Sequence, residues 1–178
     1  MSSQKDIFDE LEQYDFLDEE YLEKVVDKYS PLVGLFLINF SCLEHELNLA
    51  IANFFGDDYH ETGYVIIEKL TTRNKIELFY KIYVRLESFK DKKSKDVLNK
   101  ISQQLESINA FRNSIVHANW QSLSKDGFVR TKIIVDNQEG YVKFKKIQIT
   151  PKIIREKTKE IDKLIEKIDE YKETAFQF

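Results

Sequence analysis

The spacing of apolar residues along the chain predicts several amphipathic helices. Ser30-Pro31 is typical of a helix start, with a capping serine and a proline in the first helical position. Beyond it, apolar residues recur at steps of three, four or seven along two adjacent lines: Val33, Leu37, Phe40, Leu47, Ile51 and Phe54, and beside them Phe36, Leu43 and Ala50. This pattern predicts a helix that is buried on more than one side and ends at Gly56.

Two more helices follow the same periodicity. Thr71 or Thr72 caps a helix that carries Ile76, Phe79, Tyr80, Tyr83 and Leu86, and after a charged loop over 90–95 another begins near Ser94 and carries Val97, Ile101, Leu105, Ile108, Phe111 and Ile115. The segment 63–70 fits either a short helix or an extended piece. The acidic segment Ile7 to Val26, with sparse apolar positions, predicts one or two short surface helices.

The pattern changes after Trp120. Residues 128–135 and 141–149 are rich in β-branched and aromatic residues, and the intervening 136–140 has the composition of a hairpin loop. Thr150-Pro151 then restarts a helix. We therefore expect one mainly α domain over residues 1–178, an antiparallel helical bundle with a β-hairpin inserted before the last helix. Its parts are an acidic N-terminal helical segment, a bundle core, the hairpin and a C-terminal helix, at 1–30, 31–120, 126–149 and 151–172.

Composition narrows the class of protein. A chain that is 42% hydrophobic and 33% charged is globular rather than disordered, and its single cysteine excludes an internal disulfide and favours a reducing compartment. The longest apolar run, Leu32 to Phe40, has about half the length of a membrane span, and the acidic N-terminus does not resemble a signal peptide. We expect a cytoplasmic protein without membrane partners.

Charge is unevenly distributed although the net charge is only -4. Residues 1–30 contain ten acidic and three basic side chains, whereas residues 125–160 contain ten basic and five acidic ones. A local positive surface contacts phosphates even when the total charge is negative. On charge alone, an ordinary solvated lysine-rich surface explains the pattern equally well.

The most informative segment is Arg112-Asn113-Ser114-Ile115-Val116-His117, near the end of a predicted helix. On a helix Asn113 and His117 share one face, and the long side chain of Arg112 reaches the space in front of the imidazole. Cleavage of RNA by its own 2′-hydroxyl needs a group that takes the proton and a cation that stabilises the phosphate charge in the transition state. Histidine and arginine supply these functions without a metal or other cofactor.

This motif resembles that of the HEPN superfamily (higher eukaryotes and prokaryotes nucleotide-binding), whose ribonucleases carry Arg, a polar residue, three further residues and His. The resemblance extends more loosely over residues 31 to 120 and the last helix, and the hairpin lies outside the minimal family pattern. It implies a homodimer in which both copies contribute Arg112 and His117 to one cleft, with Asn113 orienting groups in the site. It also implies a toxin or phage-defence role, with RNA as substrate and an antitoxin or regulatory protein as a possible partner.

Other residues are candidates for supporting roles. Glu44 falls on the apolar line of its helix, where a carboxylate is costly unless paired, and Arg112 or His117 is a natural partner. Alternatively, Glu44 lies at the water-facing edge of the helix. Arg73 fits either a phosphate contact or a solvated helix start. His45 and His60 lack metal-ligand spacing, so we expect no metal site.

The hairpin carries basic residues at a spacing of two, Arg130 and Lys132 on one strand and Lys143 and Lys145 on the other. Alternation along a strand predicts that they share one face, which would hold an RNA backbone through its phosphates. The alternative is an edge hairpin that its lysines protect from aggregation.

The hypothesis that follows is a metal-independent endoribonuclease whose products carry a 2′,3′-cyclic phosphate and a 5′-hydroxyl. Its main competitor is a catalytically silent HEPN-like module that binds a protein or a nucleotide, with Arg112 and Asn113 bracing helices and His117 closing its own helix. A DNA-binding regulator is disfavoured because no helix-turn-helix signature is present.

Overall fold

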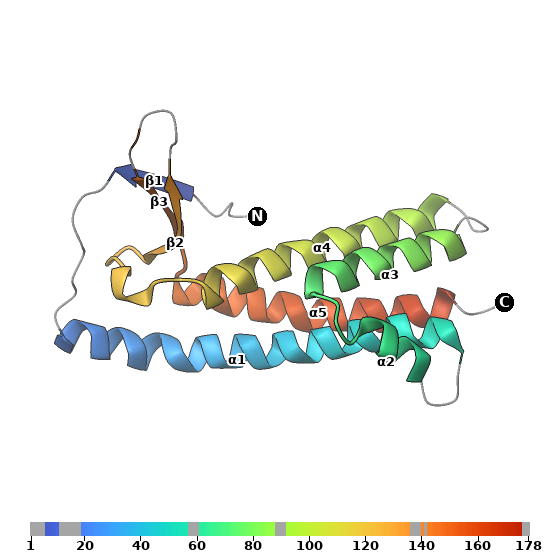
Figure 1. Ribbon diagram of the computed structural model, residues 1–178. Helices are drawn as coiled ribbons and strands as arrows, with labels where there is room; N and C mark the ends of the chain where they lie inside the picture. The colour runs from blue at the N-terminus through green and yellow to red at the C-terminus, as the bar shows by residue number, and fades with distance from the viewer. Residues whose placement is uncertain are drawn as a thin grey trace. The chain divides into compact units, whose positions relative to one another are not determined.

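The computed structural model describes residues 6–10, 19–56, 61–87, 92–135, 140 and 142–175. Its helices are α1 (Glu19–Ala52), α2 (Glu61–Ile67), α3 (Thr72–Glu87), α4 (Lys92–Val116) and α5 (Pro151–Ala175), and its strands are β1 (Asp6–Glu10), β2 (Phe128–Val135) and β3 (Val142–Gln148) (Figure 1). Short 3₁₀ turns span Asn53–Phe55 and Trp120–Ser122. A mainly helical chain with a β-hairpin before its last helix is therefore confirmed.

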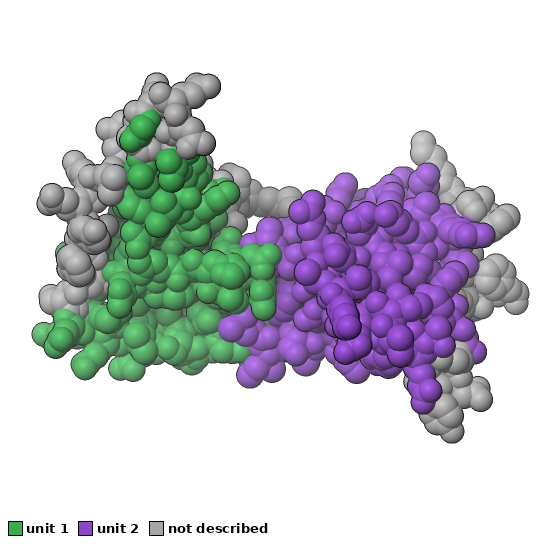
Figure 2. All heavy atoms as spheres, in the orientation of Figure 1, with its two compact units in different colours: residues 1–36, 111–156 green, residues 37–110, 157–178 purple. Residues whose placement is uncertain are grey.

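The chain forms two compact units (Figure 2). Unit 1 comprises residues 1–36 and 111–156, and unit 2 comprises residues 37–110 and 157–178. The helices α1, α4 and α5 contribute residues to both. Each unit has its own buried apolar residues, and each is described by itself below.

The start of α1 differs from the sequence-based prediction, because Pro31 lies inside the helix rather than in its first turn. A proline inside a helix removes one backbone hydrogen bond and costs about 3 kcal/mol. Two side chains of the preceding turns offset this cost, since Val25 and Tyr29 are each only 7% exposed. The Tyr29 ring lies 5.5 Å from that of Trp120. Packing in unit 1 thus extends the helix past a residue that locally predicts its beginning.

The regular secondary structure of unit 2 is helical throughout its described residues, and its helices are joined by side-chain contacts. Tyr80 on α3 donates to Asn99 on α4, and Lys172 on α5 donates to Glu46 on α1. The buried residues include most of the predicted apolar line, among them Phe40, Leu43, Leu47 and Ile51 of α1, with Phe79 and Tyr83 of α3, Leu98, Ile101, Leu105 and Ile108 of α4, and Ile161, Leu164 and Ile168 of α5.

The direction of α3 corrects the prediction of a simple antiparallel bundle. Glu44 contacts Thr72 and Lys75 at the start of α3, and the carbonyl of Ala50 accepts from Tyr83 further along it. Because later residues of α1 contact later residues of α3, the two helices run parallel. The physical reason is α2, a short helix in the ambiguous segment 63–70 that lets the chain return before α3 begins (Figure 1).

The return through α2 requires glycine at position 63. A Cβ built on Gly63 would lie 2.4 Å from the Cα and 2.7 Å from the Cβ of Ala52. Backbone atoms approach too closely here for any larger residue, and both Gly63 and Ala52 are buried.

Unit 1 contains a three-stranded antiparallel sheet in the order β1-β3-β2. The hairpin of β2 and β3 is confirmed, while most of its predicted loop lies outside the described residues. The prediction of helix over Ile7–Val26 is wrong at its start, because Asp6–Glu10 pairs with β3 from the other end of the chain. The free edge of β3 supplies the hydrogen-bonding partner, and local sequence does not reveal such a distant partner.

By length and composition alone, the helical stretch Glu19–Phe55 is apolar enough to span a membrane, with a window of mean hydropathy 1.2. The core helix of a water-soluble protein passes the same test. Three of its side chains, Phe36, Leu43 and Leu47, are at most 2% exposed and face other parts of the protein.

Candidate functional site

The last turn of α4 presents the predicted catalytic residues. Arg112 is half-buried and donates from Nη1 to Oδ1 of Asn113 at 3.1 Å, while Asn113 itself is exposed. The amide of His117 closes the final helical turn by donating to the carbonyl of Asn113 at 3.0 Å, and its side chain is exposed. The structure therefore places Arg112 and Asn113 near the end of α4 and His117 directly after its last residue, with Asn113 and His117 exposed and Arg112 half-buried.

Two neighbouring residues hold this helix end in place. The indole Nε1 of Trp120 donates to the carbonyl of Ile115 at 3.3 Å, and the amide of Ala118 donates to the same carbonyl, so this carbonyl near the helix C-terminus has two donors. Asn119 caps the following 3₁₀ turn by accepting from the amide of Gln121. The backbone beneath His117 is thus fixed although its imidazole faces solvent.

The segment after His117 is also tied to the sheet. The amide of Asn119 donates to the carbonyl of Arg130 at 2.7 Å, and these two residues form an isolated antiparallel bridge. The Ser122 hydroxyl donates to the carbonyl of Asn119 and accepts from the amide of Arg130. Strand β2 is therefore connected to the motif through main-chain hydrogen bonds.

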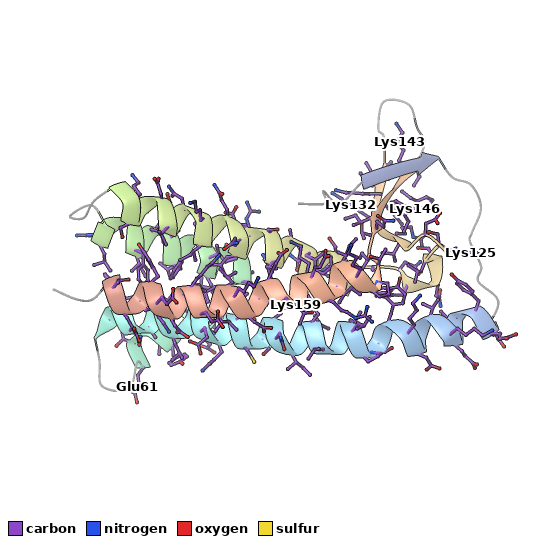
Figure 3. The ribbon with its side chains drawn as sticks, turned by 180° about the vertical axis from the view of Figure 1, so that it is seen from behind. Glu61, Lys125, Lys132, Lys143, Lys146 and Lys159 are labelled. Carbon is purple, nitrogen blue, oxygen red and sulfur yellow. The ribbon has the colours of Figure 1, made fainter. Side chains whose placement is uncertain are left out.

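The basic residues of the hairpin do not share one face, which corrects the prediction. The register pairs Arg130 with Lys146 but Lys132 with Lys145, so a bulge at Thr131 reverses the alternation of β2. Lys132 and Lys146 accordingly extend to opposite sides of the sheet in Figure 3.

The sheet thus has two different faces. Lys132, Lys143 and Lys145 lie on one face. The other, called here the Arg130 face, carries in β2 and β3 the residues Phe128, Arg130, Ile133, Val135, Val142, Phe144, Lys146 and Gln148, and the register pairs Phe144 with Asp9 of β1.

Arg130 is stacked on an aromatic ring. Its guanidinium carbon lies 4.8 Å from the centroid of Phe144, within the range of a cation–π contact. In the part of the chain that the structure describes, this guanidinium has no carboxylate partner. The ring thus holds the guanidinium in position without pairing its charge.

Glu44 lies in unit 2, where its partners are Thr72 and Lys75. The Thr72 hydroxyl donates to Glu44 Oε1 at 2.9 Å, and Lys75 Nζ lies 3.3 Å from the same oxygen. The Glu44 side chain is 31% exposed, so it occupies the water-facing edge of the helix that the alternative interpretation describes. These contacts brace α1 against α3, and a catalytic role for Glu44 stays a prediction.

A small cavity beside Glu44 is bordered by Leu47, Ile76 and Leu105. Its volume of about 10 Å³ is room for about one water molecule and excludes a nucleotide.

The remaining candidates belong to unit 2 or lie outside the described residues. Arg73 and His45 are exposed in unit 2, and Arg73 occupies the first turn of α3, so its contact with RNA stays a prediction. His60 lies outside the described residues. No cluster of three or more histidine, cysteine or acidic side chains suited to a metal is present among the described residues.

Sequence reasoning missed Asn119, Trp120 and Phe144. Trp120 is the only tryptophan of the chain and follows the motif directly, which is a signal that it anchors the helix end. Phe144 alternates with Lys143 and Lys145, so the sequence predicts that it lies on the other face of the strand. Its contact with Arg130 could not be predicted, because it depends on the bulge at Thr131.

Comparison with models of known protein families, with curated proteins and with solved structures gives no match to this chain. The resemblance to HEPN ribonucleases therefore rests on the residues of the motif.

Proposed function

We propose that this protein is a metal-independent endoribonuclease that cleaves RNA through attack of a 2′-hydroxyl on the adjacent phosphorus. The observation that carries the proposal is the exposed helix end where an arginine, an asparagine and a histidine lie within two turns. These are the groups that the reaction requires, a proton acceptor and a cation for the phosphate.

In this mechanism each residue has one task. The imidazole of His117 takes the proton from the 2′-hydroxyl as the oxygen attacks phosphorus. Arg112 binds the non-bridging oxygens, which gain charge in the transition state. Asn113 orients the guanidinium through the hydrogen bond to Nη1. The bond to the 5′-oxygen breaks, that oxygen takes up a proton, and the products carry a 2′,3′-cyclic phosphate and a 5′-hydroxyl.

The wider setting of the proposal follows from the HEPN resemblance. The active form would be a cytoplasmic homodimer in which the second copy's histidine protonates the leaving oxygen. The protein would act as a toxin, a stress effector or a phage-defence factor, restrained by an antitoxin or another regulatory protein. Exposure of the helix end favours this arrangement, since a second copy has access to His117 and Asn113.

Cleavage of total cellular RNA by the purified protein in EDTA tests the proposal. We expect the wild type to cut, and we expect His117→Ala and Arg112→Ala to lose cutting by at least about 100-fold, the lower bound for loss of a proton-transfer group. Matched controls are His45→Ala and Arg155→Ala, which remove an exposed histidine and an exposed arginine elsewhere. Circular dichroism checks that each variant is folded.

Cutting that survives in both site variants would overturn the proposal. A complete absence of cutting, with folded wild-type protein, would instead favour the silent HEPN-like module that binds a protein or a nucleotide. End-group analysis adds a further criterion, because 3′-hydroxyl products would exclude attack by the 2′-hydroxyl.

A further inference from the structure

We propose that the Arg130 face of the sheet binds single-stranded RNA, with a base stacking against Phe144 and Arg130 while the guanidinium contacts a neighbouring phosphate. This inference rests on the proposed ribonuclease function, because it concerns how the substrate is held beside His117. It adds Phe144 to the site and assigns the two faces of the sheet different roles.

The first support is position. Arg130 is bridged by its backbone to Asn119, two residues beyond His117. Paired residues of an antiparallel bridge direct their side chains to the same side, so Asn119 continues the Arg130 face towards the end of α4. An RNA strand lying on this face would pass directly to the motif.

The second support is the chemistry of the face. A half-buried ring and a stacked guanidinium form a platform for a base, because every base offers a π-face. Beside them Ile133 and Val135 are 58% and 60% exposed, which is unusual for large apolar residues on a strand. The opposite face carries Lys132, Lys143 and Lys145, with Phe8 of β1 paired to Lys145, and has no guanidinium stacked on a ring among the described residues.

Charge favours RNA as the occupant of this face. The described residues of the sheet and of the segment 119–150 include six basic residues against four acidic ones: Lys125, Arg130, Lys132, Lys143, Lys145 and Lys146 against Asp126 and, on β1, Asp6, Asp9 and Glu10. The excess of positive charge attracts a polyanion, and Arg130, which has no carboxylate partner among the described residues, is the cation that this face offers to it.

The test uses the full-length protein with His117→Ala, which keeps the RNA uncut, and a short fluorescein-labelled single-stranded RNA followed by fluorescence anisotropy. Arg130→Ala and Phe144→Leu should each raise Kd by about fivefold or more, as expected for loss of a stacked base. Matched controls are Arg155→Ala, an exposed arginine outside the sheet, and Phe54→Leu, a phenylalanine of unit 2 that is 36% exposed. Both should stay within about twofold of the parent.

A salt titration separates the two contributions. Arg130→Ala should reduce the slope of log K against log salt by about 0.7, the value for one phosphate contact on a single strand, whereas Phe144→Leu should leave the slope unchanged. Arg130→Lys keeps the charge without the planar stack, so it should restore the slope and only part of the affinity. Circular dichroism and thermal unfolding verify that these variants fold.

Three results would overturn the inference: no binding by the parent, unchanged Kd in both face variants, or a larger loss in Lys132→Ala than in Arg130→Ala. Altered self-association with unchanged RNA binding would show that a second copy occupies the face. Failure of the proposed function is recognised separately. In that case the protein with native His117 does not cut RNA, while the dependence of binding on Arg130 and Phe144 persists.

Discussion

The two units of this protein treat their polar groups differently. In unit 2 several of these groups are paired internally, as when Lys172 bonds both Glu46 and Asp169 or Tyr83 bonds the carbonyl of Ala50. In unit 1 the His117 imidazole is exposed, and the Arg130 guanidinium lies on a ring without a carboxylate partner among the described residues.

This difference shows where stability and binding are concentrated. A charge of unit 2 that is paired internally is not available to an external ligand, and the pairing holds neighbouring helices together. A cation over a ring, or a solvent-facing imidazole on a fixed helix end, contributes little to folding and keeps its capacity for an external ligand. We therefore expect substitutions in unit 2 to act on stability and substitutions of the exposed groups of unit 1 to act on function.

The largest effect is expected for His117→Ala. It should lower the rate of RNA cleavage by about 10²- to 10⁴-fold, while an exposed substitution changes the free energy of unfolding by no more than about 0.5 kcal/mol. A quantitative cleavage assay and urea denaturation measure the two quantities, with His45→Ala as the control. A large loss of stability with unchanged cleavage would reverse the comparison.

Phe79→Ala should show the opposite behaviour. The Phe79 side chain is fully buried in unit 2 and its ring lies 4.6 Å from that of Tyr83. Removal of a buried phenylalanine leaves a cavity and should lower the free energy of unfolding by about 3–5 kcal/mol in urea denaturation. Lys81→Ala on the same helix, where the side chain is 69% exposed, is the control and should change it by no more than about 0.5 kcal/mol. A loss below about 1 kcal/mol for Phe79→Ala would indicate that α3 is not part of a tightly packed core.

Gly63→Ala should destabilise the protein by about 1–3 kcal/mol through overpacking, since the new methyl group would overlap the backbone of Ala52. Gly34→Ala is a sharp control, because no atom lies within 4 Å of its added Cβ and alanine favours a helix. Thermal unfolding should therefore move in opposite directions for the two variants. Equal melting temperatures would show that α2 does not press against Ala52.

The smallest effect concerns alkaline pH and Tyr83. Burial raises the pKa of Tyr83 above its ordinary value of 10.0. The folded state therefore keeps a proton that the unfolded state releases, so this stabilisation is complete below about pH 10 and is lost as the pH rises through the folded pKa. Tyr83→Phe should cost about 1 kcal/mol at neutral pH through its lost hydrogen bond, yet show a shallower decline above pH 10.

Urea denaturation at neutral and alkaline pH measures this difference. Lys172 adds to the alkaline decline in both proteins, because burial lowers its pKa but hydrogen bonds to Asp169 and Glu46 outweigh burial and raise it above 10.5. A parallel decline in both proteins would contradict the assigned role of Tyr83.

Much of the fold could be predicted because its determinants are local. Thr71 and Thr150 start α3 and α5 as expected, each accepting from an amide three residues later. The apolar line of α1 is buried at Phe40, Leu47 and Ile51. The same reasoning failed at Pro31 and at β1, where the outcome depends on contacts with Trp120 and β3, both more than 80 residues away along the chain.

The candidate site also has features that local sequence determines and features that depend on distant contacts. The spacing of Arg112, Asn113 and His117 is a local property, and it determines by itself that these residues lie within two turns at the end of α4. The tertiary structure alone determines which residues Glu44 contacts and that Arg130 and Lys132 lie on opposite faces of the sheet. Helical spacing repeats every few residues, whereas a bulge or an ion pair between helices depends on residues that folding alone brings together.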